Sequence, residues 1–291
     1  MYSFEKLYPM YKISSIDKTQ FIRWLLQLGI LLKSLKNFED AKTILEHQIE
    51  VSKFLDNHYF IHGLKVLVGL FIKQNKLKQA YDTFFKEAKV VVKYAKSSSY
   101  ISPIIKNLII LGNRFRKKNE LKFSTRVIQY VIKLSQDSED RKSLAIGYNI
   151  LGQVKWYKKE QEHAARLFVE QIKIGQEISD YEEIKIGTRD LVKIIGRLNQ
   201  PNLRLLEDIL MVLRENKEII KNDRDLLDNL IALGEKVKAT NQVKALDFFE
   251  LSAEFYTISR KIKNLSKLKT QIKNLSKELV SDKYYKDASK A

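Results

Sequence analysis

The chain contains no cysteine, only 3 prolines and 10 glycines among 291 residues, and no long run of apolar residues. Without cysteine, disulfides, cysteine-ligated zinc, iron–sulfur clusters and thiol catalysis are excluded. So few turn-forming residues argue against an all-β sandwich or barrel. Residues 1–20 lack the apolar core of a signal peptide, and no stretch approaches the roughly 20 apolar residues of a membrane span. We therefore expect a cytoplasmic protein with no membrane span.

The positive charge is large, but lysine carries most of it. The formal net charge is +18, and 41 of the 53 basic residues are lysine. A protein of this charge attracts nucleic acid and anionic surfaces non-specifically. Arginine, the residue suited to bidentate phosphate recognition, is not enriched. An AT-rich codon bias would give the same composition, so the charge alone does not decide between a nucleic-acid ligand and a protein ligand.

Helical periodicity extends along most of the chain, and strand-like alternation is nowhere sustained. In residues 21–35 the apolar positions cover most of a helix circumference, which predicts a helix buried on more than one side. Similar patterns continue to about Leu279. These patterns predict an all-α fold.

Six glycines recur at spacings of 40, 43, 40, 44 and 38 residues: Gly29, Gly69, Gly112, Gly152, Gly196 and Gly234. After most of them comes a polar turn, then a small residue, and four positions later a large apolar residue. The clearest of these pairs are Ala41/Leu45, Ala80/Phe84, Ser124/Ile128 and Ala164/Phe168, and the sixth repeat fits more loosely with Ala245/Phe249. The fifth repeat is degenerate and carries Pro201 in its turn.

This pattern has a direct steric explanation. Glycine in a first helix and a small residue in a second helix let two antiparallel helices approach closely, and the large residue one turn further on fills the remaining space. A single hairpin of this kind cannot bury its apolar face, so several must stack. The spacing therefore predicts a repeat protein built from helix hairpins.

The repeat resembles the tetratricopeptide (TPR) signature, and its period of about 40 residues is similar to the extended-helix subtype of kinesin light chain, Pins-type adaptors and Rap-type peptide-sensing regulators. Residues 174–183 resemble the joint between such repeats. The resemblance implies a right-handed superhelical solenoid of about six hairpins over residues 18–258. Residues 1–17 would form a leader or partial helix, 259–280 a capping helix, and 281–291 a disordered tail.

The sequence gives no support for catalysis. There is no glycine-rich phosphate loop and no Gly-x-Ser-x-Gly motif. His58 and His62 have the spacing of a helical zinc motif, but Tyr59 occupies the position of the general-base glutamate and no third ligand is evident. We expect no enzyme activity, no cofactor and no metal site.

The candidate binding residues are those expected on the concave face of the first helices. Asparagine and glutamine can pair with both polar groups of an extended peptide backbone, and cations suit carboxylates. Trp156 could close the groove or pack the turn. The candidate groove residues are Arg23, Lys65, Lys106, Asn113, Arg116, Asn149, Gln153 and Trp156.

Three functions remain open at this point. The first is a non-enzymatic adaptor that holds an extended or acidic segment of a partner protein in its groove. The second is a peptide-sensing regulator that lacks a DNA-binding domain. The third is a basic protein that binds nucleic acid through surface lysines, with the partner's identity unspecified by the sequence.

Overall fold

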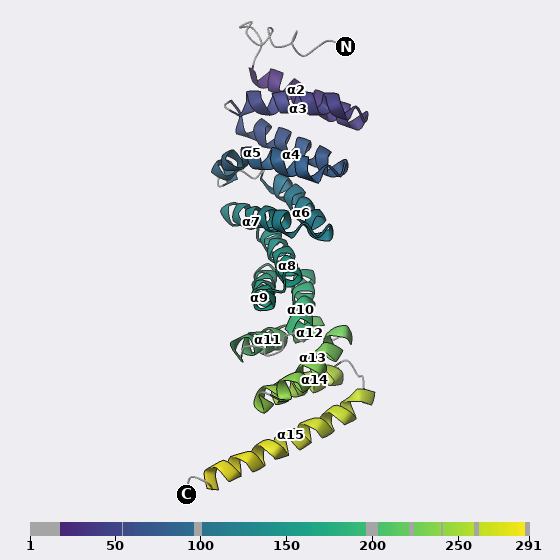
Figure 1. Ribbon diagram of the computed structural model, residues 1–291, viewed down its shortest axis with the longest axis vertical. Helices are drawn as coiled ribbons and strands as arrows, with labels where there is room; N and C mark the ends of the chain where they lie inside the picture. Colours follow the sequence, from purple (N-terminus) through teal and green to yellow (C-terminus); the bar gives the residue numbers. More distant parts are fainter. Residues whose placement is uncertain are drawn as a thin grey trace. The chain divides into compact units, whose positions relative to one another are not determined.

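The computed structural model describes residues 18–53, 55–95, 101–195, 203–220, 224–239, 241–258 and 262–288. These residues form α-helices and the turns between them, with no strand among them (Figure 1). The predicted leader, residues 1–17, lies outside the described residues. The chain divides into two compact units, residues 1–143 and 144–291, and the boundary falls in the first turn of α8. The all-α prediction is therefore confirmed.

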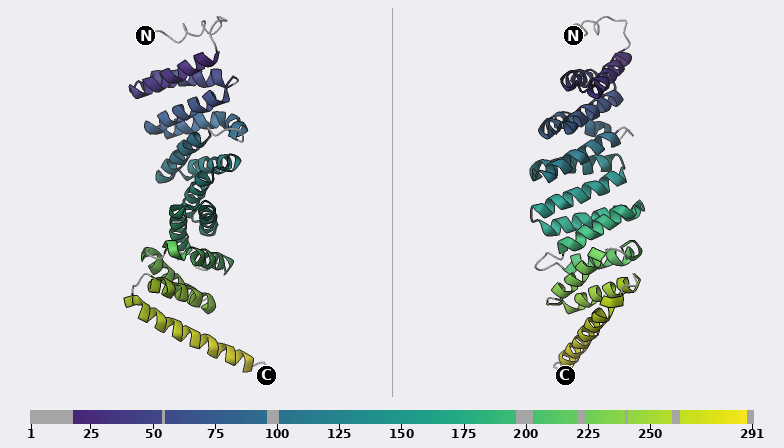
Figure 2. Two further views of the ribbon diagram at one scale, coloured as in Figure 1. Left: turned by 180° about the vertical axis from the view of Figure 1, so that it is seen from behind. Right: turned by 90° about the vertical axis from the view of Figure 1, so that its right-hand side faces the viewer.

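Unit 1 consists of three consecutive helix hairpins, each pairing a first helix with the helix that follows (Figure 2). Each hairpin also contacts the next, since α4 packs on both α2 and α3, and α6 packs on both α4 and α5. The helices are α2 (Lys18–Ser34), α3 (Phe38–Ser52), α4 (Asn57–Lys73), α5 (Leu77–Ala95), α6 (Ser102–Lys117) and α7 (Leu121–Asp137).

Unit 2 contains three further hairpins and the long C-terminal helix (Figure 1). A single continuous core joins them, with Phe168, Phe248, Phe249 and Phe255 among its fully buried side chains. The helices are α8 (Arg141–Tyr157), α9 (Gln161–Glu177), α10 (Tyr181–Ile195), α11 (Leu203–Glu215), the short α12 (Lys217–Ile220), α13 (Arg224–Lys238), α14 (Gln242–Ile258) and α15 (Ile262–Ala288).

The predicted close approach of first and second helices is confirmed in four hairpins. A β-carbon added at Gly152 would lie 2.7 Å from the ring of Phe168, and one at Gly29 would lie 2.7 Å from Leu45. Gly112 meets Ile128, and Gly234 meets Phe249, in the same way. The small residues Ala41, Ala80, Ser124, Ala164 and Ala245 are all fully buried.

Gly69 has a different role from the one that its spacing predicted. Val68, fully buried, occupies the hairpin-facing position, because it lies twelve residues before Ala80 just as Gly29 lies twelve before Ala41. Gly69 instead faces Asn107 of α6, whose amide donates a hydrogen bond of 2.8 Å to the carbonyl oxygen of Lys65. Gly196 lies outside the described residues.

An aspartate precedes the first helix of several hairpins and caps its N-terminus. Asp56 accepts hydrogen bonds from the backbone N–H groups of His58 and Tyr59 at the start of α4. Asp140 does the same for Ser143, and Asp180 for Glu182 and Glu183. These aspartates satisfy N–H groups that have no partner within the helix, and so they fix where each new hairpin starts.

The structure differs from the sequence prediction near the C-terminus. α15 packs on α14 and buries Leu268 and Leu275, as expected for a capping helix. It continues past residue 280 to Ala288, where a disordered tail was predicted. No glycine or proline follows Leu279 to end the helix. Residues 289–291 lie outside the described residues.

Candidate functional site

Three lysines and a histidine gather on the first helices of the first two hairpins of unit 1. They are Lys33 of α2 and His62, Lys65 and Lys73 of α4, and we call them the unit 1 cationic face. Burial lowers the pKa of the Lys33 ammonium group, and the positive charges of Lys73 and Lys65 lower it further. The lysines of two neighbouring hairpins therefore lie close enough to repel one another.

His62 experiences the same positive field. Burial lowers the pKa of its imidazole, and the charges of Lys65 and His58 add to this effect. The His58 and His62 rings lie 6.1 Å apart in an edge-on arrangement. Among the described residues no group of three histidine, aspartate or glutamate side chains is placed to hold a metal ion.

The ammonium groups of Lys33, Lys65 and Lys73 have no hydrogen-bonding or ion-pairing partner among the described residues. Each is at least partly accessible to solvent. Uncompensated like charges destabilise the folded state, because no carboxylate offsets their repulsion and desolvation. The arrangement is therefore suited to an anionic group that comes from outside the described part of the chain.

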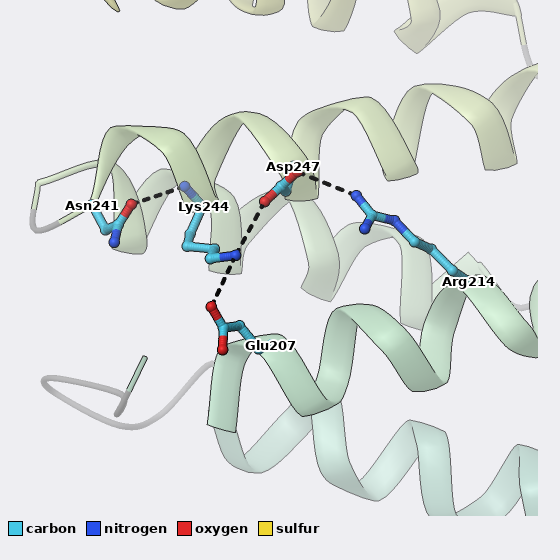
Figure 3. A network of polar contacts seen from close by, with 5 residues as sticks. All are labelled: Glu207, Arg214, Asn241, Lys244 and Asp247. Carbon is cyan, nitrogen blue, oxygen red and sulfur yellow. Dashed lines mark hydrogen bonds and ion pairs between the residues drawn. The ribbon is translucent and has the colours of Figure 1, made fainter. Parts of the chain in front are cut away.

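In contrast, charged side chains on the second helices of unit 2 form ion pairs with one another. Lys244 lies between two carboxylates, 3.3 Å from Glu207 of α11 and 3.6 Å from Asp247 of α14 (Figure 3). Asp247 also accepts from Arg214 at 3.2 Å. These alternating charges compensate one another across α11 and α14. Lys244 is therefore compensated by carboxylates, whereas Lys33, Lys65 and Lys73 of unit 1 have none among the described residues.

The other predicted groove residues of unit 1 are at least partly accessible. Arg23 and Lys106 are exposed, on α2 and α6. Arg116 donates two hydrogen bonds to the Oδ1 atom of Asn113, at 3.1 and 2.7 Å. The side-chain oxygen of Asn113 is thus occupied, while its amide N–H groups have no partner among the described residues.

The predicted groove residues of unit 2 form an internal polar network. Asn149 donates to Gln171 of α9 at 3.0 Å and to Asp190 of α10 at 3.4 Å. Gln153 donates to the Asn149 oxygen and to Asp190, each at 3.1 Å. Both amides therefore connect helices within unit 2. Trp156 is half-buried and packs against the core of that unit.

Sequence reasoning missed the buried glutamine at the centre of this network. Gln171 is fully buried, and its amide donates to the carbonyl oxygen of Glu183 at 3.1 Å and to the Glu183 carboxylate at 2.8 Å. Gln48 of α3 repeats the arrangement in unit 1 and donates to the carbonyl oxygen of Tyr59 at 2.9 Å.

A recurring position could have revealed these glutamines. Each lies seven residues after the small residue of its hairpin, Ala41 or Ala164, and each packs over a glycine of the next first helix, Gly63 or Gly187. These glycines fall outside the series that defined the repeat. The buried glutamines join successive hairpins, so they are structural residues.

Comparisons with known proteins identify similar folds only. Neither a family model nor a curated protein matches the chain. A STAND protein with a tetratricopeptide repeat sensor from Pyrococcus horikoshii is 15% identical, with a TM-score of 0.49; the match covers 92% of this chain and 42% of that one. A putative kinesin light chain with TPR-like repeats from Podosopora anserina is 11% identical, with a TM-score of 0.40, covering 70% of this chain and 99% of that one.

A Rap protein complexed with competence and sporulation factor is also similar, at 12% identity and a TM-score of 0.39, with 96% of this chain and 81% of that one covered. The TPR-like character of this chain rests on its own packing of glycine, small residue and large residue within each hairpin. None of the described helices is long and apolar enough to cross a membrane.

Proposed function

We propose that this chain is a non-enzymatic protein-interaction adaptor whose unit 1 cationic face binds an acidic, extended segment of a partner protein. The observation that carries the proposal is the set of mutually repelling lysines on α2 and α4, which make no ion pair among the described residues. Side chains that cost stability in the free protein and have no internal partner are candidates for ligand binding. A carboxylate placed among them would relieve their repulsion.

The predicted groove residues take different parts in this proposal. Lys65, together with Lys33 and Lys73, pairs with ligand carboxylates, and Arg23 and Lys106 extend the positive surface along the same set of first helices. The free amide N–H groups of Asn113 suit a backbone carbonyl of the ligand, with Arg116 holding the Asn113 side chain in place. Asn149 and Gln153 would have to give up bonds to Asp190 to bind a ligand.

Nucleic-acid binding is the second candidate, and one observation favours it. Lys267, Lys269, Lys273 and Lys277 of α15 are exposed, and their ammonium groups make no ion pair among the described residues. These lysines are separate from the unit 1 cationic face in the chain, so the two candidates can be tested with different variants.

The test is a binding titration with a fluorescein-labelled oligo-glutamate peptide. We expect Lys65→Met to weaken binding by about tenfold to 100-fold, since a partly buried charge-assisted contact contributes about 1.5–3 kcal/mol. The same variant should unfold at an equal or higher urea concentration, because it removes the repulsion between Lys65 and Lys33. Lys269→Met is the matched control from α15 and should leave the affinity unchanged. Equal losses in the two variants would exclude a specific role for the unit 1 cationic face.

A further inference from the structure

α9 and α11 are the second helices of successive hairpins in unit 2 (Figure 1), and a cavity of about 370 Å³ lies between them. Val169 of α9 and Leu205 of α11 line this cavity and are themselves buried, so they form an apolar floor. Exposed charged residues of both helices, among them Arg166 and Arg204, form the rim. Small-molecule sites are hollows of about 300–1,000 Å³ that combine apolar walls with a few polar groups. The cavity has the size and the lining of such a site.

Aromatic rings fill the corresponding space between α5 and α7, the second helices of two successive hairpins in unit 1. The ring centroids of Tyr81 and Phe123 lie 5.0 Å apart, and those of Phe85 and Tyr130 lie 4.8 Å apart. The guanidinium group of Arg126 lies over the Phe85 ring, 4.9 Å from its centroid. Rings at these distances are in contact, so four aromatic side chains join α5 to α7.

Smaller side chains occupy the matching positions of α9. Ala164 has the place in α9 that Ala80 has in α5, because each is the buried small residue of its hairpin. In this register Ala165 and Val169 stand where α5 carries its two contacting rings. Both are buried, and neither is large enough to reach α11 as an aromatic ring would.

The register of α11 follows from its buried residues, which recur at the spacing of those in α7. The matching buried residues are Leu206, Ile209, Leu210 and Leu213 in α11, and Ser124, Val127, Ile128 and Val131 in α7. Leu205 and Val212 then stand where α7 carries Phe123 and Tyr130. All four ring positions are therefore aliphatic or alanine in α9 and α11. The cavity is the space that aromatic rings fill in unit 1.

Two rim residues of opposite charge have no polar partner among the described residues. Arg166 of α9 and Asp208 of α11 both line the cavity, and neither makes a hydrogen bond or an ion pair with a described residue. Charge-assisted hydrogen bonds are about twice as strong as neutral ones. We propose that the cavity binds an aromatic amino acid, either free or as the C-terminal residue of a peptide. Its ring packs on Val169 and Leu205, its carboxylate pairs with Arg166, and its nitrogen donates to Asp208.

The test is a titration of the full chain followed by fluorine NMR. One probe is para-fluoro-L-phenylalanine, and the other is a tripeptide of two alanines that ends in the same fluorinated residue. We expect saturable binding with a dissociation constant below about 1 mM, and the probe that binds more tightly identifies the free amino acid or the peptide end as the ligand. Arg166→Gln should weaken binding about tenfold. Arg126→Gln, the same change at the matching position of α7, is the control and should leave binding unchanged.

A second variant fills the cavity from within. Val169→Phe introduces the residue that α5 carries at the matching position, and it should reduce binding at least tenfold without lowering the melting temperature, because the ring enters an existing space. Arg166 is exposed, so Arg166→Gln tests the site even where Val169→Phe does not fold. The proposal is overturned if neither probe saturates, or if folded Val169→Phe binds as tightly as the wild type. Equal losses in Arg166→Gln and Arg126→Gln would also overturn it.

Discussion

Six residues other than glycine have a left-handed backbone conformation among the described residues, and each lies in a turn between helices. They are Lys36, Asn75, Asn119, Glu139, Lys159 and Ser179, with φ between 55° and 64°. At the end of α8, Lys159 donates its N–H to the carbonyl oxygen of Trp156 and Glu160 donates to that of Lys155. This is the Schellman arrangement, which glycine usually provides because it has no β-carbon. The chain therefore ends its helices at some cost.

We predict that Lys159→Gly stabilises the protein by about 0.5–1 kcal/mol, because relief of the left-handed strain exceeds the added entropy of the unfolded chain. Asn119→Gly is the matched comparison, and its gain should be smaller since asparagine tolerates this conformation. Urea denaturation of the two variants measures both effects. A loss of stability in Lys159→Gly would show that contacts of the lysine side chain outweigh backbone strain.

His62 makes stability depend on pH. Its folded-state pKa lies below the ordinary value of 6.5, owing first to burial and then to Lys65 and His58. As pH falls through 6.5, the unfolded chain takes up a proton that the folded chain takes up only at lower pH, so the free energy of unfolding decreases. We expect His62→Gln to reduce this decrease between pH 7.5 and 5.5 in urea titrations. His163→Gln, at an exposed position paired with Glu160, serves as the control. Identical pH profiles for wild type and His62→Gln would contradict the prediction.

At the scale of the element, the hairpins depend on close contact between a glycine and a large side chain. Gly152→Ala would place a β-carbon 2.7 Å from the buried ring of Phe168, and Gly69→Ala one 3.2 Å from the half-buried amide of Asn107. Overpacking against a fixed ring costs roughly 1–3 kcal/mol, whereas alanine gains up to about 1 kcal/mol in helix propensity over glycine. We expect Gly152→Ala to lower the melting temperature and Gly69→Ala to change it little. Equal effects in thermal unfolding would contradict the assigned register.

The joints between hairpins depend on buried glutamines. Gln171→Met would remove the hydrogen bonds of Gln171 with the Asn149 amide and with the carbonyl oxygen and carboxylate of Glu183, at a cost of about 1–3 kcal/mol. Gln48→Met should cost less, because the Oε1 atom of Gln48 already lacks a partner among the described residues, so one unsatisfied group is removed with the side chain. The two free energies of unfolding, measured in urea, test this order. A larger loss for Gln48→Met would contradict it.

These two kinds of contact also explain how much the sequence could predict. The contact within a hairpin recurs as glycine, small residue and large residue at nearly fixed spacing, so periodicity alone predicts it. The contact between hairpins occupies a position that is Gln48, Glu87, Val131 and Gln171 in successive repeats, and two other helices, α8 and α10, supply the partners of Gln171. No fixed residue pattern marks that position. Asn149 and Gln153 were predicted as groove residues. Their hydrogen-bond partner, Asp190, belongs to the next hairpin, so the pattern of their own repeat does not reveal the contact.

At the scale of the whole molecule, the net charge is +18, and only some of the lysines that contribute to it make ion pairs. Lys155, Lys217 and Lys244 make ion pairs with carboxylates. The lysines of the unit 1 cationic face, and Lys267, Lys269, Lys273 and Lys277 of α15, make no ion pair among the described residues. Sequence composition predicted the excess charge, but only the structure distinguishes compensated from uncompensated lysines. The pairs of Lys217 with Glu254 and of Lys244 with Glu207 join helices that are far apart in the sequence.

The two candidate ligands differ in how their binding should depend on salt. Binding to duplex DNA releases counterions, so the logarithm of affinity falls with that of salt concentration by about 0.9 per phosphate contact. Replacing Lys269, Lys273 and Lys277 with alanine should reduce this slope by up to about 2.7 if α15 contacts DNA. It should leave binding of the oligo-glutamate peptide unchanged, whereas Lys65→Met should weaken peptide binding and hardly affect DNA. Each ligand is titrated with each variant at 50 and about 200 mM salt, the range over which phosphate contacts have large effects. These titrations measure the salt dependence of DNA binding and the affinity for the peptide in both variants. DNA binding that stays tight at the higher salt and is lost in the triple variant, together with no measurable peptide binding, would replace the adaptor function with the nucleic-acid one.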